Sequence, residues 1–176
     1  RDSFSVDLEA LKNDDAAVVL ANPNAPTGRA LPRDEIVALV ESNRDRLVVI
    51  DEAYFGFGAE TAVPLVAGHD NLVVTRSLSK SHGLAGLRVG YAIAQAELIE
   101  GLNRVKDSFN SYPLDAVAQS AATAAIEDRQ WLEAASQSVR DVREVMSTGL
   151  EAIGFEVLPS QANFIFIQHN TPVSYT

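Results

Sequence analysis

Short apolar runs alternate with longer amphipathic segments along the first hundred residues of this chain. Valine, leucine, isoleucine and alanine dominate four such runs, which predict buried strands at 16–21, 47–50, 72–75 and 89–94. After the first run, Pro32, Asp34 and Glu35 suit the first turn of a helix, and apolar residues at 36–40 supply its buried face. Strands that alternate with helices predict an α/β fold with a largely parallel sheet flanked by helices.

The second part of the chain is dominated by good helix formers. The pattern predicts helices at 96–106, 114–126 and 130–153. Gly154 suits a helix stop, and 155–158 and 163–167 predict two further strands. Because the composition changes around 108–113, we predict a domain boundary near residue 110.

Polar, turn-rich segments directly follow three of the predicted strands. They read NPNAPTG at 22–28, DEAY at 51–54 and TRSLSKSHGLAGLRVG at 75–90. In open α/β sheets, ligands bind outside the carboxyl ends of the strands. These three segments are therefore expected to meet at one edge of the sheet and to contain the candidate site.

Charge and composition narrow the class of molecule. Lysine and arginine (14) are outnumbered by aspartate and glutamate (24), and the net charge of −10 argues against a nucleic-acid partner. The chain has no cysteine, which excludes disulfides and thiolate metal sites. No apolar stretch approaches the roughly 20 residues that span a bilayer, so we expect a cytoplasmic protein without a membrane partner.

Lys80 is the most informative residue of the chain. Its neighbours Ser77 and Ser79 offer hydroxyl donors, and Arg88 follows eight residues later in a glycine-rich segment. An amine can join an aldehyde covalently, while hydroxyls and a two-pronged guanidinium suit a phosphate group. This combination predicts a pyridoxal 5′-phosphate (PLP) site, with Lys80 as the reactive amine and proton carrier.

Two residues after the second strand fit the ring of the same cofactor. Asp51 ends an apolar strand, where a carboxylate is costly unless it has a partner, and a protonated pyridine nitrogen would be that partner. Tyr54, three residues on, is predicted to hydrogen-bond the phenolic oxygen of the ring. A plain turn-capping role for Asp51 is the alternative.

These motifs resemble those of the fold-type I PLP-dependent aminotransferases, and within them those of the histidinol-phosphate aminotransferases. The resemblance rests on DEAY at 51–54, on SK followed by LAGLR within 79–88, on NSYP at 110–113 and on QANFI at 161–165. It implies that Lys80 is the Schiff-base lysine. The other cofactor-binding residues that it implies are Asp51, Tyr54, Ser77, Ser79 and Arg88.

The resemblance also implies an activity and an architecture. The reaction would be reversible amino transfer from histidinol phosphate to 2-oxoglutarate, giving imidazole acetol phosphate and glutamate, a step of histidine biosynthesis. Residues 1–110 would be part of the large PLP-binding domain, and 111–176 would form interdomain helices and the start of a smaller α+β domain. Members of the family are homodimers, so a homodimer is expected here.

Two departures from the family pattern affect these expectations. The family commonly has asparagine before Pro-Thr-Gly, where this chain has Ala25, so Asn24 either replaces the missing cofactor-binding amide or has only a turn role. Family members are also about twice as long. This chain resembles an interior section, and the residues that stack on the ring and bind the substrate carboxylate would lie outside it.

Other functions remain open on the sequence alone. An aromatic amino acid aminotransferase or a PLP-dependent decarboxylase would share the cofactor but differ in substrate or chemistry. A truncated PLP-fold module that only binds or dimerises would lack catalysis altogether. The three histidines, His69, His82 and His169, are too scattered to predict a metal site, and we interpret them as structural or solvent-facing.

Overall fold

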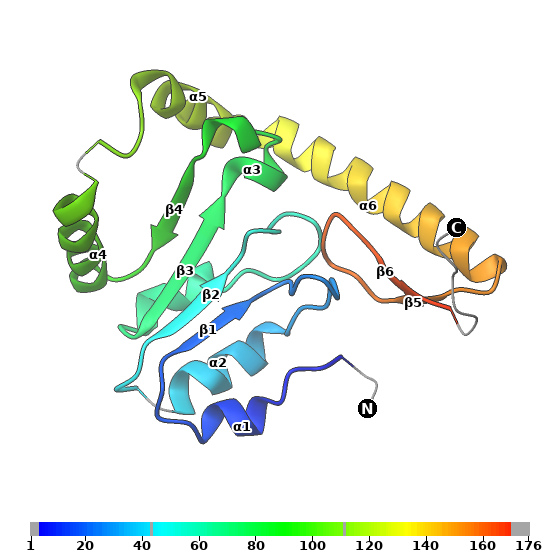
Figure 1. The fold of residues 1–176 in the computed structure, drawn as a ribbon, viewed down its shortest axis with the longest axis horizontal. Coiled ribbons are helices and arrows are strands. Elements are labelled where there is room, and N and C mark those ends of the chain that lie inside the picture. The colour runs from blue at the N-terminus through cyan, green and yellow to red at the C-terminus, as the bar shows by residue number, and fades with distance from the viewer. Residues whose placement is uncertain (1–3, 43, 111, 170–176) are drawn as a thin grey trace.

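The computed structural model describes residues 4–42, 44–110 and 112–169. Four strands form the main sheet in the order β1 (Val18–Ala21), β2 (Val48–Asp51), β3 (Leu72–Ser77) and β4 (Gly90–Ile93), as Figure 1 shows. The pairs β1–β2 and β2–β3 are parallel, whereas β3–β4 is antiparallel. The predicted α/β fold with a largely parallel sheet is confirmed, and each of the four predicted strands is present.

The main core lies on one face of this sheet. Helix α2 (Arg33–Ser42) packs there with the 3₁₀ helix η1 (Val63–Gly68), and α1 (Leu8–Lys12) lies beside α2. The larger core side chains that are fully buried are Ile36, Leu39, Val40, Val48, Ile50, Leu72 and Val74. Burying each such aliphatic side chain stabilises the fold by roughly 1.5–3 kcal/mol, so this cluster fixes the strand positions behind the candidate site.

A second, smaller core joins the end of β3 to the helical part of the chain. It contains Leu78 and Val89, which pack against Ala118 and Ala122. These residues come from α3 (Leu78–Ser81), from the segment after the 3₁₀ helix η2 (Ala85–Leu87), and from α5 (Ala116–Glu127). Alanines on α5 allow its backbone to approach closely, and the contact holds the lysine-bearing turn against the helix.

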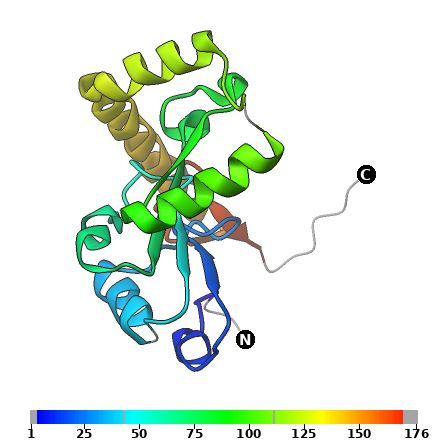
Figure 2. The ribbon, with the colours of Figure 1, turned by 90° about the vertical axis from the view of Figure 1, so that its left-hand side faces the viewer.

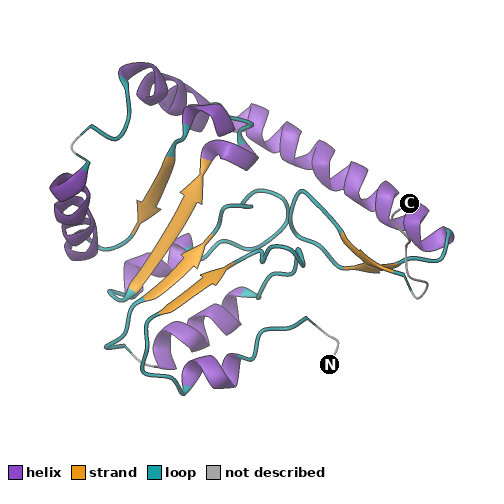
Figure 3. Cartoon of the chain, in the orientation of Figure 1, coloured by secondary structure: helices purple, strands orange, loops and turns teal. Residues whose placement is uncertain are grey.

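The remaining elements extend from this body. Helix α4 (Ala96–Phe109) crosses in front of the sheet in Figure 2, and the long α6 (Arg129–Ala152) runs from α5 to a separate hairpin of β5 (Glu156–Leu158) and β6 (Phe166–Gln168). Figure 3 shows the hairpin apart from the main sheet. No helix in the described ranges is long and apolar enough to cross a membrane.

One strand prediction was wrong in part. Residues 163–165 were expected to belong to the last strand, but β6 begins only at Phe166. The Ser160 hydroxyl donates to the carbonyl oxygen of Phe164 at 2.6 Å, and the Gln161 N–H donates to that of Gly28 at 2.7 Å. These bonds hold the segment as a loop against the turn after β1. The domain boundary predicted at 110/111 adjoins residue 111, which lies outside the described residues.

Candidate functional site

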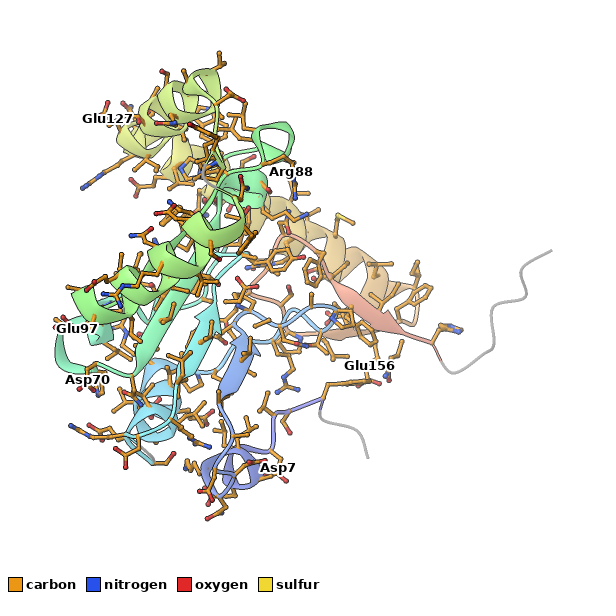
Figure 4. All side chains as sticks on the ribbon, turned by 60° about the vertical axis from the view of Figure 1, so that its left-hand side comes forward. Asp7, Asp70, Arg88, Glu97, Glu127 and Glu156 are labelled. Atoms are coloured by element: carbon orange, nitrogen blue, oxygen red, sulfur yellow. The ribbon has the colours of Figure 1, made fainter. Side chains whose placement is uncertain are left out.

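The three segments expected to converge do meet at one edge of the sheet. Asp51 is in register with Ala21 on one side and Thr75 on the other, and Ser77 is paired with Gly90. Because β4 is antiparallel, its beginning lies beside the end of β3. Figure 4 shows Arg88 near this end of the sheet and Asp70, which precedes β3, at the opposite end.

Asp51 stands at the end of β2 with one side-chain oxygen engaged. The Thr75 hydroxyl donates to Oδ1 at 2.9 Å, and the backbone N–H of Asn22 donates to the Asp51 carbonyl at 2.9 Å. Within the described ranges, Oδ2 of Asp51 has no hydrogen-bond partner. Thr75 therefore orients the carboxylate, which keeps one oxygen available to a cationic or protonated ligand.

Lys80 lies in the short helical turn that follows β3. Ser77 caps this turn: its Oγ accepts from the Ser79 N–H at 3.1 Å and donates to the Ser79 hydroxyl at 2.8 Å. The Lys80 side chain is exposed, and no hydrogen bond or ion pair of its amine occurs among the residues that the structure describes. The amine is thus presented at the sheet edge without a competing protein partner.

Arg88 precedes β4 and lies at the same edge. Its backbone is left-handed, with φ 55°, and its Nη1 donates to the carbonyl of Ala85 at 3.2 Å. A Cβ at Gly90 would lie 3.1 Å from the Arg76 carbonyl oxygen, so a side chain there would force these strands apart. The rest of the exposed guanidinium remains available for an anionic group.

Tyr54 and Asn24 differ in how the structure places them. The Tyr54 ring packs edge-to-face on Phe164, with centroids 5.1 Å apart, so the loop before β6 supports it. The Asn24 side-chain amide donates to the Thr27 hydroxyl at 2.8 Å, and the Asn24 backbone carbonyl accepts from the Gly28 N–H. Of the two roles considered for Asn24, these bonds favour the turn role.

Sequence reasoning missed three side chains at this edge. Thr75 was assigned only to a strand, although a parallel register places its hydroxyl beside Asp51. Glu52 and Arg76 form an ion pair of 2.8 Å in which the Glu52 side chain is only 2% exposed. Charged residues usually lie at the surface, so neither residue type gave a signal, whereas the alternation along β3 could have revealed Thr75.

His82 is a packed residue in this structure. Its ring lies 5.9 Å from that of Phe55 and stacks on Trp131 of α6 at 6.5 Å, and Nδ1 lies 2.9 Å from the Ser81 hydroxyl. Burial lowers the pKa of His82 below its usual value, which favours the neutral ring. This supports the structural interpretation. No cluster of three or more metal-ligating side chains occurs in the described part of the chain.

Comparisons with known proteins agree with this geometry. The family model described as aminotransferase class I and II matches residues 1–175. Histidinol-phosphate aminotransferase 2 of Thiobacillus denitrificans is 57% identical over 168 residues, which are 96% of this chain and 47% of that protein. The chain thus spans about half the length of the curated relatives it matches.

Solved structures share the fold. Histidinol-phosphate aminotransferase from Sinorhizobium meliloti, in complex with pyridoxal-5′-phosphate, superposes with a TM-score of 0.82 at 26% identity, covering 93% of this chain and 45% of that one. L-threonine-O-3-phosphate decarboxylase from Porphyromonas gingivalis gives 0.74 at 27% identity, with coverages of 92% and 52%. The fold-type I prediction is therefore confirmed, and the chain belongs to the class I and II aminotransferase family.

Proposed function

We propose that the full-length protein is a PLP-dependent aminotransferase that transfers the amino group of histidinol phosphate to 2-oxoglutarate. The observation that carries the proposal is the meeting of Asp51, Lys80 and Arg88 at one sheet edge, in a chain 57% identical to a histidinol-phosphate aminotransferase. PLP requires an amine, an anionic partner for its ring nitrogen and donors for its phosphate. The residues at this edge fit that requirement.

Each side chain has a role that follows from its surroundings. Lys80 would hold the cofactor covalently and, once released by the substrate, would carry a proton on Nζ. Asp51, with one oxygen engaged by Thr75, would hold the proton on the ring nitrogen through the other. Tyr54 would donate to the phenolic oxygen. When bound, PLP supplies the electron sink for charge developing at the substrate α-carbon.

The phosphate would lie at the lysine-bearing turn. Ser77 and Ser79 already share a hydrogen bond, so their hydroxyls form one donor unit at the end of β3. Arg88 adds a planar guanidinium, whose paired N–H groups match two phosphate oxygens better than a lysine would. Asn24 remains a candidate ligand of the phenolic oxygen only if one proton of its amide is free for it, because the other is given to Thr27.

The remainder of the protein would complete the enzyme. We assign residues 1–110 to part of the large cofactor-binding domain and 111–176 to interdomain helices and the start of the small domain. The substrate-binding residues would lie outside this chain. We expect the enzyme to act as a homodimer in the cytoplasm. Net charge −10 supports the absence of a nucleic-acid partner.

A decarboxylase is the second candidate, because the L-threonine-O-3-phosphate decarboxylase shares this fold with a TM-score of 0.74. The two activities differ in their products. Amino transfer releases a 2-oxo product and consumes a 2-oxo acid, whereas decarboxylation releases carbon dioxide. The full-length protein with PLP and 2-oxoglutarate is mixed in separate reactions with histidinol phosphate, with aromatic amino acids and with L-threonine-O-3-phosphate. Glutamate formation reports amino transfer and carbon dioxide release reports decarboxylation, so the two assays separate these candidates.

The first experiment is a spectroscopic titration of the full-length protein with PLP, followed by borohydride reduction and peptide mapping. We expect the label on Lys80, and we expect the Lys80→Ala variant to lose the label and at least about 10²- to 10⁴-fold of the transamination rate. A binding-only module would take up no covalent cofactor. Turnover that survives in the lysine variant would overturn the proposed mechanism.

A further inference from the structure

We propose that the buried Glu52–Arg76 ion pair is a positioning element that fixes the orientation of Asp51 and Ser77 toward the cofactor. The inference rests on the proposed function and deepens it. It assigns a role in cofactor binding to two residues that lie on the other side of the strand ends.

The pair has the geometry of a strong, oriented interaction. Arg76 donates through Nε at 3.0 Å and through Nη2 at 2.8 Å, both to Oε2 of Glu52. The exposed fraction is 2% for the Glu52 side chain and 15% for that of Arg76. Two N–H groups of a rigid guanidinium on one oxygen restrict both side chains to a single arrangement.

Further donors complete the shell of Glu52. Its Oε1 accepts from the backbone N–H of Ala62 at 2.6 Å, and the Thr61 hydroxyl lies 2.8 Å from Oε2 and 3.0 Å from Oε1. Arg76 in turn lies over the Phe55 ring, 4.2 Å from its centroid. The pair is therefore held from the 61–62 loop on one side and from the segment after β2 on the other.

The ion pair can affect the candidate site because it lies at the ends of β2 and β3, next to the site residues. Glu52 directly follows Asp51, and Arg76 lies between Thr75 and Ser77. Successive side chains of a strand point to opposite faces, so the pair occupies the face opposite to the cofactor-facing groups. The Glu52 N–H donates to the Thr75 carbonyl at 2.8 Å, which makes the two strand ends one unit.

Energetics argue that the pair does more than stabilise the fold. Burying two charges costs desolvation energy that their attraction often only balances, and well-packed hydrophobic residues of similar volume can replace such pairs without loss of stability. What a neutral replacement does not reproduce is a fixed angle between the two strand ends. A shift of about 1 Å in a catalytic group can reduce a rate by about 100-fold, so a positioning role predicts functional loss without unfolding.

The test uses the full-length protein and three variants of the pair. Arg76→Lys keeps the charge and removes the two-pronged geometry, and Glu52→Gln removes one charge. The double variant Glu52→Leu/Arg76→Met replaces both charges by hydrophobic side chains of similar length. Each is measured for melting temperature, for the PLP dissociation constant by absorbance titration, and for kcat and KM. Glu60→Gln is the matched control, because Glu60 lies in the same loop but at the surface. There it pairs with the Arg33 guanidinium at 3.6 Å and accepts from the Arg33 backbone N–H at 3.2 Å, a bond that glutamine can keep.

We expect the double variant to melt close to the unaltered protein, yet to bind PLP about tenfold more weakly and to lose about tenfold in kcat, with KM for the amino donor little changed. Arg76→Lys should show the same functional pattern, and Glu60→Gln should show none of it. If a single variant does not fold, the double variant still decides the question.

Three outcomes separate the alternatives. PLP affinity and kcat that match the unaltered protein in a variant that folds normally would overturn the positioning role. Losses that simply follow the melting temperature, and return in full when the neutral pair restores it, would also overturn it. An unaltered full-length protein that takes up no PLP on Lys80 would instead refute the proposed function itself.

Discussion

At the scale of single residues, Arg88 offers a test of phosphate recognition that preserves charge. Lysine at this position would keep the positive charge but replace a planar, two-pronged donor by a point charge, so we expect Arg88→Lys to raise the PLP dissociation constant by about tenfold in the full-length protein. The measurement is an absorbance titration. Arg104→Lys on α4, where Arg104 pairs with Glu100, is the control; equal affinities for both variants would remove Arg88 from the phosphate site.

His82 predicts a pH dependence of stability. Burial lowers its pKa in the folded protein, whereas the unfolded chain has the usual value of about 6.5. Between these two values the unfolded state binds more protons, so the free energy of unfolding rises with pH in this interval. The stability that neutral His82 contributes is fully present above about pH 6.5 and is lost as the pH falls toward the lowered pKa of the folded state. The ceiling for one proton is about 1.4 kcal/mol per pH unit.

Denaturant unfolding of the full-length protein at a series of pH values between about 5 and 7.5 checks this prediction. His82→Phe should retain the contacts with Phe55 and Trp131 while removing the titrating group, so its stability should vary less over that range. An unchanged pH profile in this variant would show that other groups cause the dependence.

At the scale of elements, replacing glycine by alanine is expected to change the free energy of unfolding in opposite directions at two positions. Gly28 has φ +74°, and a Cβ there would lie 2.8 Å from the Ser160 Cβ, where the loop before β6 meets the turn after β1. Gly28→Ala should therefore lower the free energy of unfolding by more than about 1 kcal/mol. Gly149 lies within α6 with nothing near its missing side chain, so Gly149→Ala should raise it by about 0.5–1 kcal/mol.

Chemical denaturation of the full-length protein measures both substitutions. Ser160→Gly removes the collision but also the hydroxyl that binds Phe164, so the double variant is compared with Ser160→Gly alone. Against that background Gly28→Ala should still lower the free energy of unfolding, by less than in the unaltered protein, because the positive φ remains. No cost at all would mean that the backbone tolerates alanine at Gly28.

The elements also show which parts of the structure could be predicted from the sequence. Val48–Asp51 and Leu72–Ser77 were predicted to within two residues, because a buried parallel strand is a continuous apolar run. The antiparallel direction of β4 was not predictable, since strand direction leaves no trace in such a run. The short helix Leu78–Ser81 was not predicted, because four residues are too few to show the hydrophobic periodicity of a helix.

The site divides in the same way. Lys80, Asp51 and Arg88 could be chosen from the sequence because each follows a predicted strand or lies in a glycine-rich segment. The partners Thr75 and the Glu52–Arg76 pair required the strand register, which pairs residues 24 positions apart. Contacts across strands depend on which residues face each other, and a single sequence does not specify this register.

At the scale of the whole molecule, α4 presents an apolar face that the described part of the chain does not cover. No residue of α4 is buried, and Leu102, Val105 and Phe109 are 46%, 61% and 78% exposed. Their spacing of three and four residues places them on one side of the helix. Since this chain spans about half the length of its curated relatives, we expect the rest of the full-length protein to cover this face.

Thiol labelling tests this expectation, and the absence of cysteine from the 176 residues makes an introduced thiol a clean probe. Val105→Cys should react with a maleimide at least about tenfold more slowly in a cysteine-free full-length protein than in the 176-residue chain, because burial limits access to the thiolate. Glu97→Cys, in the first turn of the same helix, should react at similar rates in both. Equal rates at position 105 would mean that the apolar face stays open to solvent in the complete protein, and its exposure would then need a partner outside the chain.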